Sequence, residues 1–528
     1  MITLPRNIQN GQAIDLRDVP LAAVADFRRT VIETTRAGGR IVALFGCRAA
    51  APGGLSVASE GAGATSACTA AAPGFEVRLF AVLAHEGAQE LEVLSTDVGA
   101  SYPALTPECM QAHLFEREIF EQCGVRPEGH PWLKPVRFPN CSARERLRAP
   151  LGVPPAECGV TDFFRVEGEE VHEVAVGPVH AGIIEPGHFR FQCHGENVQH
   201  LEISLGYQHR GVERALRDGP AARTLPYLET LSGDTTIGHA LAGCGAIEAL
   251  AGAEPSPRAH ALRGIALELE RLANHTGDMG ALANDVGFLP TASFCGRLRG
   301  DWLNMTALLC GSRFGRGMVR PGGTGFDADA ARLADLRRRL EATFKDTAGA
   351  VEMLWVTPSV LARFEETGPV RGKTCRALGL VGVAARACGM NRDVRAEFPF
   401  GVYRTSPMPA AVWRGGDVCA RAWVRWLEIQ RSVEFIRGQL DRLPEGDVRR
   451  PVGALRPNAL VVSLTEGWRG EIAHVAITDE RGRFGHYKVV DPSFHNWMGL
   501  ALALRGQQIS DFPLCNKSFN LSYCGHDL

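Results

Sequence analysis

The stretch GENVQHLEISLGYQHRGVERAL, residues 195–216, marks where the pattern of the chain changes. Strand-like segments at 173–180 and 188–195 precede it, and a Gly195-Glu196-Asn197 turn leads into a further strand at 198–206. Beyond it, apolar residues recur at helical spacing. The clearest such segments are 257–275, 333–344 and 426–440. This part of the chain is therefore predicted to combine a short β-rich start with a body of packed helices.

The sequence on either side of this region predicts further β structure. An amphipathic helix is expected at 21–35, followed by strands at 40–45, 75–83 and 91–94. Close to the end of the chain, 474–478 and 485–490 flank the turn-forming residues Asp479-Glu480-Arg481-Gly482, a hairpin pattern. The fold class is therefore α+β: a small N-terminal α+β domain, then a large, mainly helical domain that ends in a hairpin.

A domain boundary is expected where periodicity is lost. The segment 136–159 contains four prolines and four arginines and shows no helical or strand repeat, which is typical of a linker. We therefore predict a first domain at 1–140, a linker at 141–170 and a second domain at 171–528.

Composition excludes several classes of protein. The chain has 528 residues with 57 Lys and Arg against 59 Asp and Glu, a net charge of −2, which is unlike a basic nucleic-acid binder or a disordered acidic chain. The longest uncharged stretch, 61–75, is too short and too polar to span a bilayer. The first residues lack the pattern of a signal peptide. We expect a cytoplasmic protein whose membrane association, if any, is peripheral.

The cysteines do not predict a cofactor site. There are 15 of them, and no two are separated by two residues, so no CxxC motif is present. Iron–sulfur clusters and structural zinc sites usually use such pairs. We expect free, mostly buried thiols and no iron–sulfur cluster in this chain.

Several long motifs resemble one family. FEREIFEQCGVRPEGHPWLKPVRFP (115–139) resembles the end of the small hydrophilic 30 kDa subunit of complex I. Four later stretches resemble the large subunit of membrane-bound, energy-converting [NiFe] hydrogenases and its relative, the complex I 49 kDa subunit. The order of the two parts is similar to the fused subunit of formate hydrogenlyase and hydrogenase-4 type complexes. The four stretches are 177–191, 195–216, 268–282 and 468–497.

The resemblance also identifies where a [NiFe] centre would be held. The family uses four cysteine thiolates, two in a motif that aligns with residues 229–239 and two near the end of the chain. The matching positions here are Ser232, Thr235, Ser522 and Gly525. An unactivated hydroxyl is a poor substitute for thiolate at nickel. The chain also stops three residues beyond Gly525, without the extension of nickel-containing relatives, so we expect no nickel–iron centre and no bound metal.

The complex I branch uses the same cleft for quinone, with a tyrosine and a histidine near the headgroup. The tyrosine position is Gly243 here, which weakens a quinone-reductase interpretation. Either His180 or His188 matches the quinone histidine, and the sequence does not distinguish them.

Four residues are candidates for lining the cleft and transferring protons. These are His188, Asp234, His239 and Arg469. A histidine titrates near neutral pH, and burial shifts the pKa of a carboxyl group. The plain alternative is that they only satisfy one another's hydrogen bonds. The partner of Arg469 is left open between Asp234 and Glu471.

Two further sets of residues have mainly structural interpretations. The motif Gln208-His209-Arg210-Gly211 is either functional or a hydrogen-bond network at a helix start. Glu268 and Glu270 lie about 200° apart around a helix, so they form no joint site, and at least one is expected to be solvated.

The resemblance implies a component of a membrane-associated, complex I-related redox complex with a redox or proton-coupling role. Its expected partners are a subunit that carries iron–sulfur clusters and a set of antiporter-like membrane subunits, which would hold it at the inner face of the cell membrane. Quinone is a further candidate ligand, and no nucleic acid is expected. Two alternatives stay open. One is an active oxidoreductase that reduces quinone or acts as a hydrogenase in the same cleft, and the other is a non-catalytic coupling scaffold.

Overall fold

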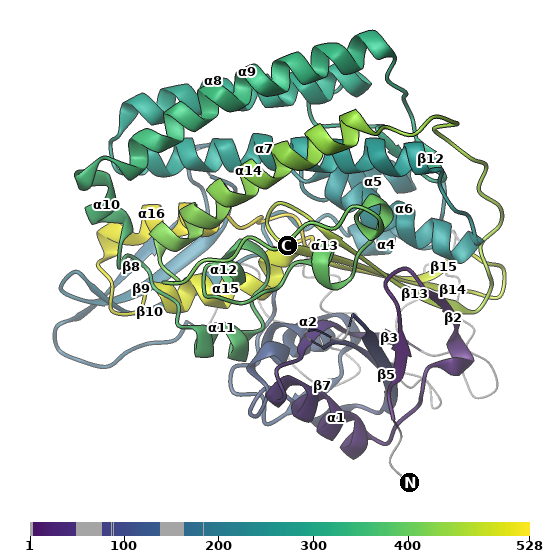
Figure 1. The fold of residues 1–528 in the computed structure, drawn as a ribbon. Helices are drawn as coiled ribbons and strands as arrows, with labels where there is room; N and C mark the ends of the chain where they lie inside the picture. The colour runs from purple at the N-terminus through teal and green to yellow at the C-terminus, as the bar shows by residue number, and fades with distance from the viewer. Residues whose placement is uncertain (1–3, 49–76, 86, 88, 138–162, 183) are drawn as a thin grey trace.

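The computed structural model describes residues 4–48, 77–85, 87, 89–137, 163–182 and 184–528, and it has the α+β architecture that the sequence predicts. Figure 1 shows the long helices on one side of the molecule and the N-terminal strands and helices on the other, with the C-terminal strands between them. Residues 141–162 of the predicted linker lie outside the described residues, so the domain bounds stay predictions.

The N-terminal part is built on a four-stranded antiparallel sheet of order β1-β5-β4-β3. Its strands are β1 (Arg6–Ile8), β3 (Arg40–Arg48), β4 (Val77–Ala84) and β5 (Leu91–Val98). Helix α1 (Val24–Arg36) buries the apolar stripe that its sequence predicts, and α2 (His113–Cys123) packs on β3. Two short strands, β6 (Ser101–Pro103) and β7 (Arg126–Glu128), pair in parallel.

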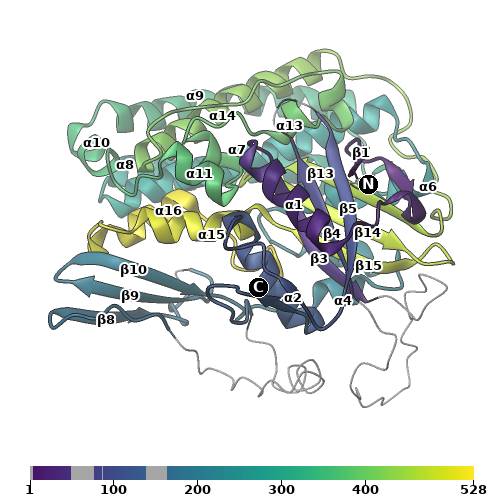
Figure 2. The ribbon, with the colours of Figure 1, turned by 90° about the horizontal axis from the view of Figure 1, so that it is seen from below.

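The second part begins with the predicted β segments. β8 (Val171–Val176), β9 (His188–His194) and β10 (Asn197–Ser204) form an antiparallel sheet of order β10-β9-β8, whose strands lie side by side at the left of Figure 2. Short helices follow, α4 (Val212–Leu216) and α5 (Thr224–Glu229).

The helical body contains α6 (Thr236–Ala251), α7 (Pro257–Asp285), α8 (Leu289–Cys310), α9 (Ala330–Trp355) and α14 (Val418–Asp441). The Ser256 side chain caps α7, and Pro257 occupies its first turn, where a missing N–H costs nothing. Shorter elements connect the long helices. They are β11 (Val319–Arg320), β12 (Gly323–Thr324), α10 (Pro358–Phe364), α11 (Gly372–Leu378), α12 (Gly382–Arg386) and α13 (Val394–Glu397).

The C-terminal hairpin is confirmed and belongs to a larger sheet. β13 (Ala459–Glu466), β14 (Glu471–Thr478) and β15 (Phe484–Val490) pair antiparallel, and β2 (Ala13–Asp15) from the N-terminal part adds to β13. Every residue of β13 and β14 is buried, so both faces of these strands are covered. Helices α15 (Pro492–Ala503) and α16 (Phe512–Phe519) complete the fold.

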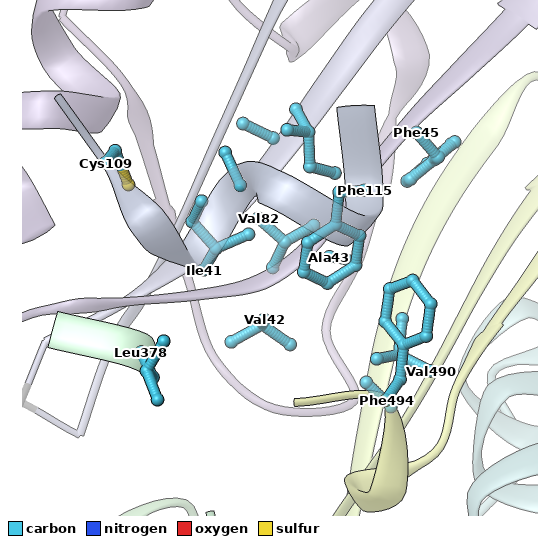
Figure 3. Close-up of a cluster of buried hydrophobic side chains, with 14 of the residues drawn as sticks. Ile41, Val42, Ala43, Phe45, Val82, Cys109, Phe115, Leu378, Val490 and Phe494 are labelled. Atoms are coloured by element: carbon cyan, nitrogen blue, oxygen red, sulfur yellow. The ribbon is translucent and has the colours of Figure 1, made fainter. Parts of the chain in front are cut away.

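The two parts of the chain share one hydrophobic core. Figure 3 shows Phe115 of α2 facing Phe494 and Val490 from the C-terminal part, and the rings of Phe115 and Phe494 meet edge-on at 5.0 Å. Ile41 and Phe45 of β3 belong to the same cluster. The N-terminal part is therefore packed against the strands that carry the candidate site.

The prediction that Glu268 or Glu270 is solvated is wrong, because α7 is covered on all sides and both residues are buried. Each carboxylate has buried donors: Glu268 contacts Arg271 and Arg395, whereas Glu270 accepts the backbone N–H groups of Ile237 and Gly238 at the start of α6.

Among the described helices, none is both long and apolar enough to cross a membrane.

Candidate functional site

The two segments that the resemblance identifies as ligand segments meet in space. The Oγ atoms of Ser232 and Ser522 are 3.1 Å apart, although the residues are 290 positions apart in the chain. Ser522 also accepts the backbone N–H of Gly525 at 2.9 Å, and Ser232 donates to Asp234 at 2.8 Å. The ligand positions therefore converge as expected, and their hydroxyl groups form hydrogen bonds with neighbouring groups.

Gly525 has no room for a side chain. A Cβ atom built on it would lie 2.3 Å from Oδ2 of Asp491, far inside van der Waals contact. The Asp491 carboxylate is fixed, because it accepts the backbone N–H of Ser493 at 2.8 Å and lies 3.2 Å from Nε2 of His239. A buried carboxylate thus occupies the space into which a residue at position 525 would project.

Asp234 and Arg469 form a two-pronged ion pair, with N–O distances of 2.6 and 2.8 Å. Burial alone would raise the pKa of Asp234, but the Arg469 guanidinium outweighs burial and lowers it to about 2. Arg469 also donates to the carbonyl of Asn520 and lies over the Trp468 ring. The open question is resolved: Arg469 pairs with Asp234, whereas Glu471 pairs with Arg40.

His239 lies in a buried hydrogen-bond chain. Its Nδ1 is 3.1 Å from Nε2 of His474, whose Nδ1 is 2.9 Å from the Tyr487 hydroxyl, and its Nε2 faces Asp491. Burial, together with the neighbouring imidazole of His239, holds the pKa of His474 well below its usual value. His474 is therefore neutral, so one of its ring nitrogens donates a hydrogen bond in this chain and the other accepts one.

His188 stands apart from the other three candidates. It begins β9, its Nδ1 lies 3.2 Å from the carbonyl of Gly177, and its buried Nε2 has no hydrogen-bond partner among the described residues. No hydrogen bond or ion pair between described residues joins it to Asp234, His239 or Arg469. The structure thus pairs Asp234 with Arg469 and joins the side chain of His239 to His474 and Asp491.

A second polar cluster was missed by sequence reasoning. The Glu118 carboxylate of α2 lies 2.7 Å from Lys488 and 2.6 Å from Arg137, with His526 at 3.2 Å. Lys488 also reaches Glu213 at 2.9 Å. The only local sign of this cluster in the sequence is Lys488, a charged residue in the middle of the predicted strand that forms β15. This cluster ties the N-terminal part to the tail that carries Ser522.

The Gln208-His209-Arg210-Gly211 motif holds the same tail. The Asp527 carboxylate accepts the backbone N–H groups of Arg210 and Val212 at 2.9 and 2.7 Å, and His209 lies 3.2 Å from it. The motif thus forms a hydrogen-bond network at the start of α4, as its structural interpretation predicts.

Taken with the fold, this site defines a class: a large subunit in which two remote segments close a buried polar centre, preceded by a packed α+β domain. Residues 285–457 match the family described as the respiratory-chain NADH dehydrogenase 49 kDa subunit, and residues 63–149 match the 30 kDa subunit family. The predicted order of the two parts in one chain is therefore confirmed.

Individual relatives agree. The chain is 30% identical to the carbon monoxide-induced hydrogenase of Rhodospirillum rubrum, over 66% of this chain and 97% of that protein. It is 30% identical to NADH-quinone oxidoreductase subunit 4 of Thermus thermophilus, over 69% and 94%. It is 28% identical to formate hydrogenlyase subunit 5 of Escherichia coli, over 80% and 76%. The chain belongs to the family that unites complex I 49 kDa subunits with these hydrogenase subunits, and it carries a fused 30 kDa-type domain.

Proposed function

We propose that this chain is a component of a complex I-related, energy-converting redox complex, that it holds no [NiFe] centre, and that its buried polar centre couples proton movement to the complex. Its relatives are named as subunits of formate hydrogenlyase and of NADH-quinone oxidoreductase, which supports the assignment to a multisubunit redox assembly.

The single observation that carries the proposal is the donor set at the converged segments. Two serines, a threonine and a glycine stand where the family has thiolates, and nickel in such centres needs soft sulfur ligands. Asp491 fills the space beside Gly525, and Arg469 is held by Asp234. Because the four positions offer no sulfur, and Gly525 has no room for a side chain, the residues present do not fit a [NiFe] group.

The quinone alternative has less support. Gly243, at the position of the family's quinone tyrosine, faces Leu228: a Cβ atom on Gly243 would lie 2.4 Å from a methyl carbon of that buried leucine. A tyrosine side chain therefore has no equivalent space here.

Proton coupling is supported by the chain from Tyr487 to Asp491. Three hydrogen bonds link a phenol, two imidazoles and a carboxylate inside the protein. In this arrangement His239 accepts a proton from one side and passes it to Asp491 on the other, whereas Asp234 stays ionised against Arg469. An iron–sulfur subunit and antiporter-like membrane subunits are the proposed partners, and they would attach the chain to the inner face of the membrane.

Metal analysis and redox spectroscopy on the purified whole complex test the proposal. We expect iron from a partner subunit and no stoichiometric nickel. One nickel per chain with a hydrogenase-type spectrum would refute the proposal, and so would a native chain that stays monomeric after gentle crosslinking. The scaffold alternative predicts that the complex assembles but that no variant of the polar chain alters ion movement.

A further inference from the structure

A separate group of charged side chains lies inside the helical body. Its members come from α7, α12, α13, α14 and the end of β13, and none of them exposes more than 1% of its side chain. We call this group the buried charge cluster. It consists of Glu268, Arg271, His275, Arg386, Asp393, Arg395, Glu428 and Glu466.

The arginines bridge the carboxyl groups in a continuous series. Arg271 contacts Glu268 and Glu428, both at 3.1 Å. Arg386 lies 2.5 Å from Glu428 and 2.6 Å from Glu466. Arg395 closes the series by pairing with Asp393 at 2.6 Å and with Glu268 at 3.1 Å. Because every member touches another, the cluster responds to a change of charge as one unit.

The charges of the cluster do not balance without an extra proton. Within the cluster, three guanidinium groups face four carboxyl groups, so with a neutral His275 the cluster itself carries one excess negative charge. Arg431 of α14 lies outside the cluster and donates to the carbonyl of Pro409, although its charge also acts on Glu428 and Asp393. An uncompensated buried charge is costly. We propose that this cluster binds one exchangeable proton, held on Glu466, and that it is a second proton-holding site of the molecule. This inference rests on the proposed coupling function.

Glu466 is the member with the fewest charged donors. The Glu428 carboxylate accepts hydrogen bonds from Arg271 and Arg386 and lies 2.8 Å from Nε2 of His275. The other ring nitrogen of His275 is buried and has no partner among the residues that the structure describes. On Glu466, one oxygen accepts from Arg386 and the other from the backbone N–H of Val394 at 3.0 Å.

The pKa directions agree with this geometry. Burial, reinforced by Asp393 and only partly opposed by Arg386, raises the pKa of Glu466 to about 7. The pKa of Glu428 stays well below its usual value, because Arg386 and Arg271 outweigh its burial.

The neighbouring strand also carries charge. Glu471 of β14 pairs in register with Glu466, and Arg40 of β3 holds it. Its pKa is raised by burial, against the pull of Arg40.

The position of Glu466 links the cluster to the candidate site. Two hydrogen bonds of 2.8 and 3.1 Å between Gly467 and Gly470 close the turn that follows Glu466, and this turn carries Arg469. Arg271 of the cluster donates to the backbone carbonyls of Glu466 and Gly467. A proton gained or lost on Glu466 therefore changes the charge directly before the turn that carries Arg469, the partner of Asp234.

Infrared difference spectroscopy on the full chain with ¹³C-labelled glutamate carboxyl groups tests the proposal. We expect a glutamic-acid C=O band that disappears as the pH rises through about 7 and that is absent from Glu466→Gln. Glu270, whose pKa burial raises to about 8, contributes a further band, as do Glu116 and Glu471, whose pKa values burial also raises. Glu466→Gln should leave these bands in place. Glu434→Gln, at an exposed position of α14, is the matched control and should keep every band.

A milder variant covers the case in which Glu466→Gln does not fold. Val394 is the first residue of α13, where proline is tolerated, and Asp393 before it is already extended. Val394→Pro removes one donor to Glu466, so the band that titrates near neutral pH should persist to higher pH. An unchanged set of bands in either folded variant would overturn the proposal. Nickel analysis is independent of this readout, so the failure of one proposal is distinguishable from the failure of the other.

Discussion

The most direct test of the site geometry is Gly525→Ala. The backbone of Gly525 is not left-handed, so an alanine brings no backbone strain, and its cost comes from the Cβ atom that would lie 2.3 Å from Asp491 Oδ2. Overpacking a filled interior costs about 1–3 kcal/mol. Moving the Asp491 carboxylate away from Ser493 or His239 loses a hydrogen bond to a charged group, about 1.5–3 kcal/mol. The two costs are not fully additive, because a shift of the carboxylate relieves part of the overpacking, and we expect a loss of about 2–5 kcal/mol in local stability.

Hydrogen exchange of peptides that cover residues 512–528 measures this loss. Since about 1.4 kcal/mol corresponds to a factor of ten, exchange of the tail amides should accelerate by about 30-fold to several thousand-fold. Gly233→Ala is the matched control, because a Cβ atom there meets nothing within 4 Å. It should change the free energy of opening that exchange reports by less than about 0.5 kcal/mol. Exchange in Gly525→Ala that equals the control would refute the assignment of Asp491 to this space.

A double variant separates the clash from other effects. Asp491 caps α15 by accepting the Ser493 N–H, and serine is also a good capping residue. Asp491→Ser shortens the side chain that the new Cβ atom meets. Adding it to Gly525→Ala should recover much of the lost protection, and simple additivity of the two losses would contradict direct contact.

Three other predictions concern titration and packing. His239→Gln keeps hydrogen-bonding capacity but removes titration near neutral pH, so the complex should assemble with reduced coupled ion movement; normal transport would exclude His239 as a carrier. Lys488→Met removes the ammonium group that Glu118 and Glu213 share, and it should lower the free energy of unfolding, measured with heat or denaturant, by about 3–5 kcal/mol. The control Arg297→Ala, at an exposed ion pair, should lower it by less than about 1 kcal/mol. Burial would lower the pKa of His209, but the hydrogen bond to Asp527 outweighs burial and raises that pKa. Protection of residues 512–528 from hydrogen exchange should therefore be full below about pH 6.5 and should fall as the pH rises through the pKa of His209 in the folded protein. His209→Gln should abolish this pH dependence, and an unchanged pH profile would disprove the assignment.

Elements with strong local signals were predictable. The start of α7 has a capping serine and a first-turn proline, and the hairpin of β14 and β15 has a turn-forming tetrapeptide between alternating strands. The second half of α7 and the whole of α8 gave no comparable signal. Gly280 lies where a Cβ atom would be 2.7 Å from the Cys295 side chain, so the glycine permits close approach of the two helices. Such a residue weakens the local helical pattern while it serves tertiary packing.

The candidate site was predictable only where a motif marked it. The resemblance identified Ser232 and Ser522, and their convergence followed from it. The partners that give the site its chemistry lie far away in the chain: Asp491 is 252 positions from His239, and Lys488 is 370 positions from Glu118. No local periodicity encodes such pairs, because the fold alone sets the distance between them.

The two carboxylates of the candidate site have different charged neighbours. Asp234 and Arg469 neutralise each other, which leaves Asp491 as the second carboxylate of the site, with His239 as its closest titratable neighbour. Burial would raise the pKa of Asp491, but its hydrogen bond with His239 and the charge of Arg469 lower that pKa, so Asp491 is an ionised carboxylate inside the protein. This ionised carboxylate fills the space into which a side chain at position 525 would project.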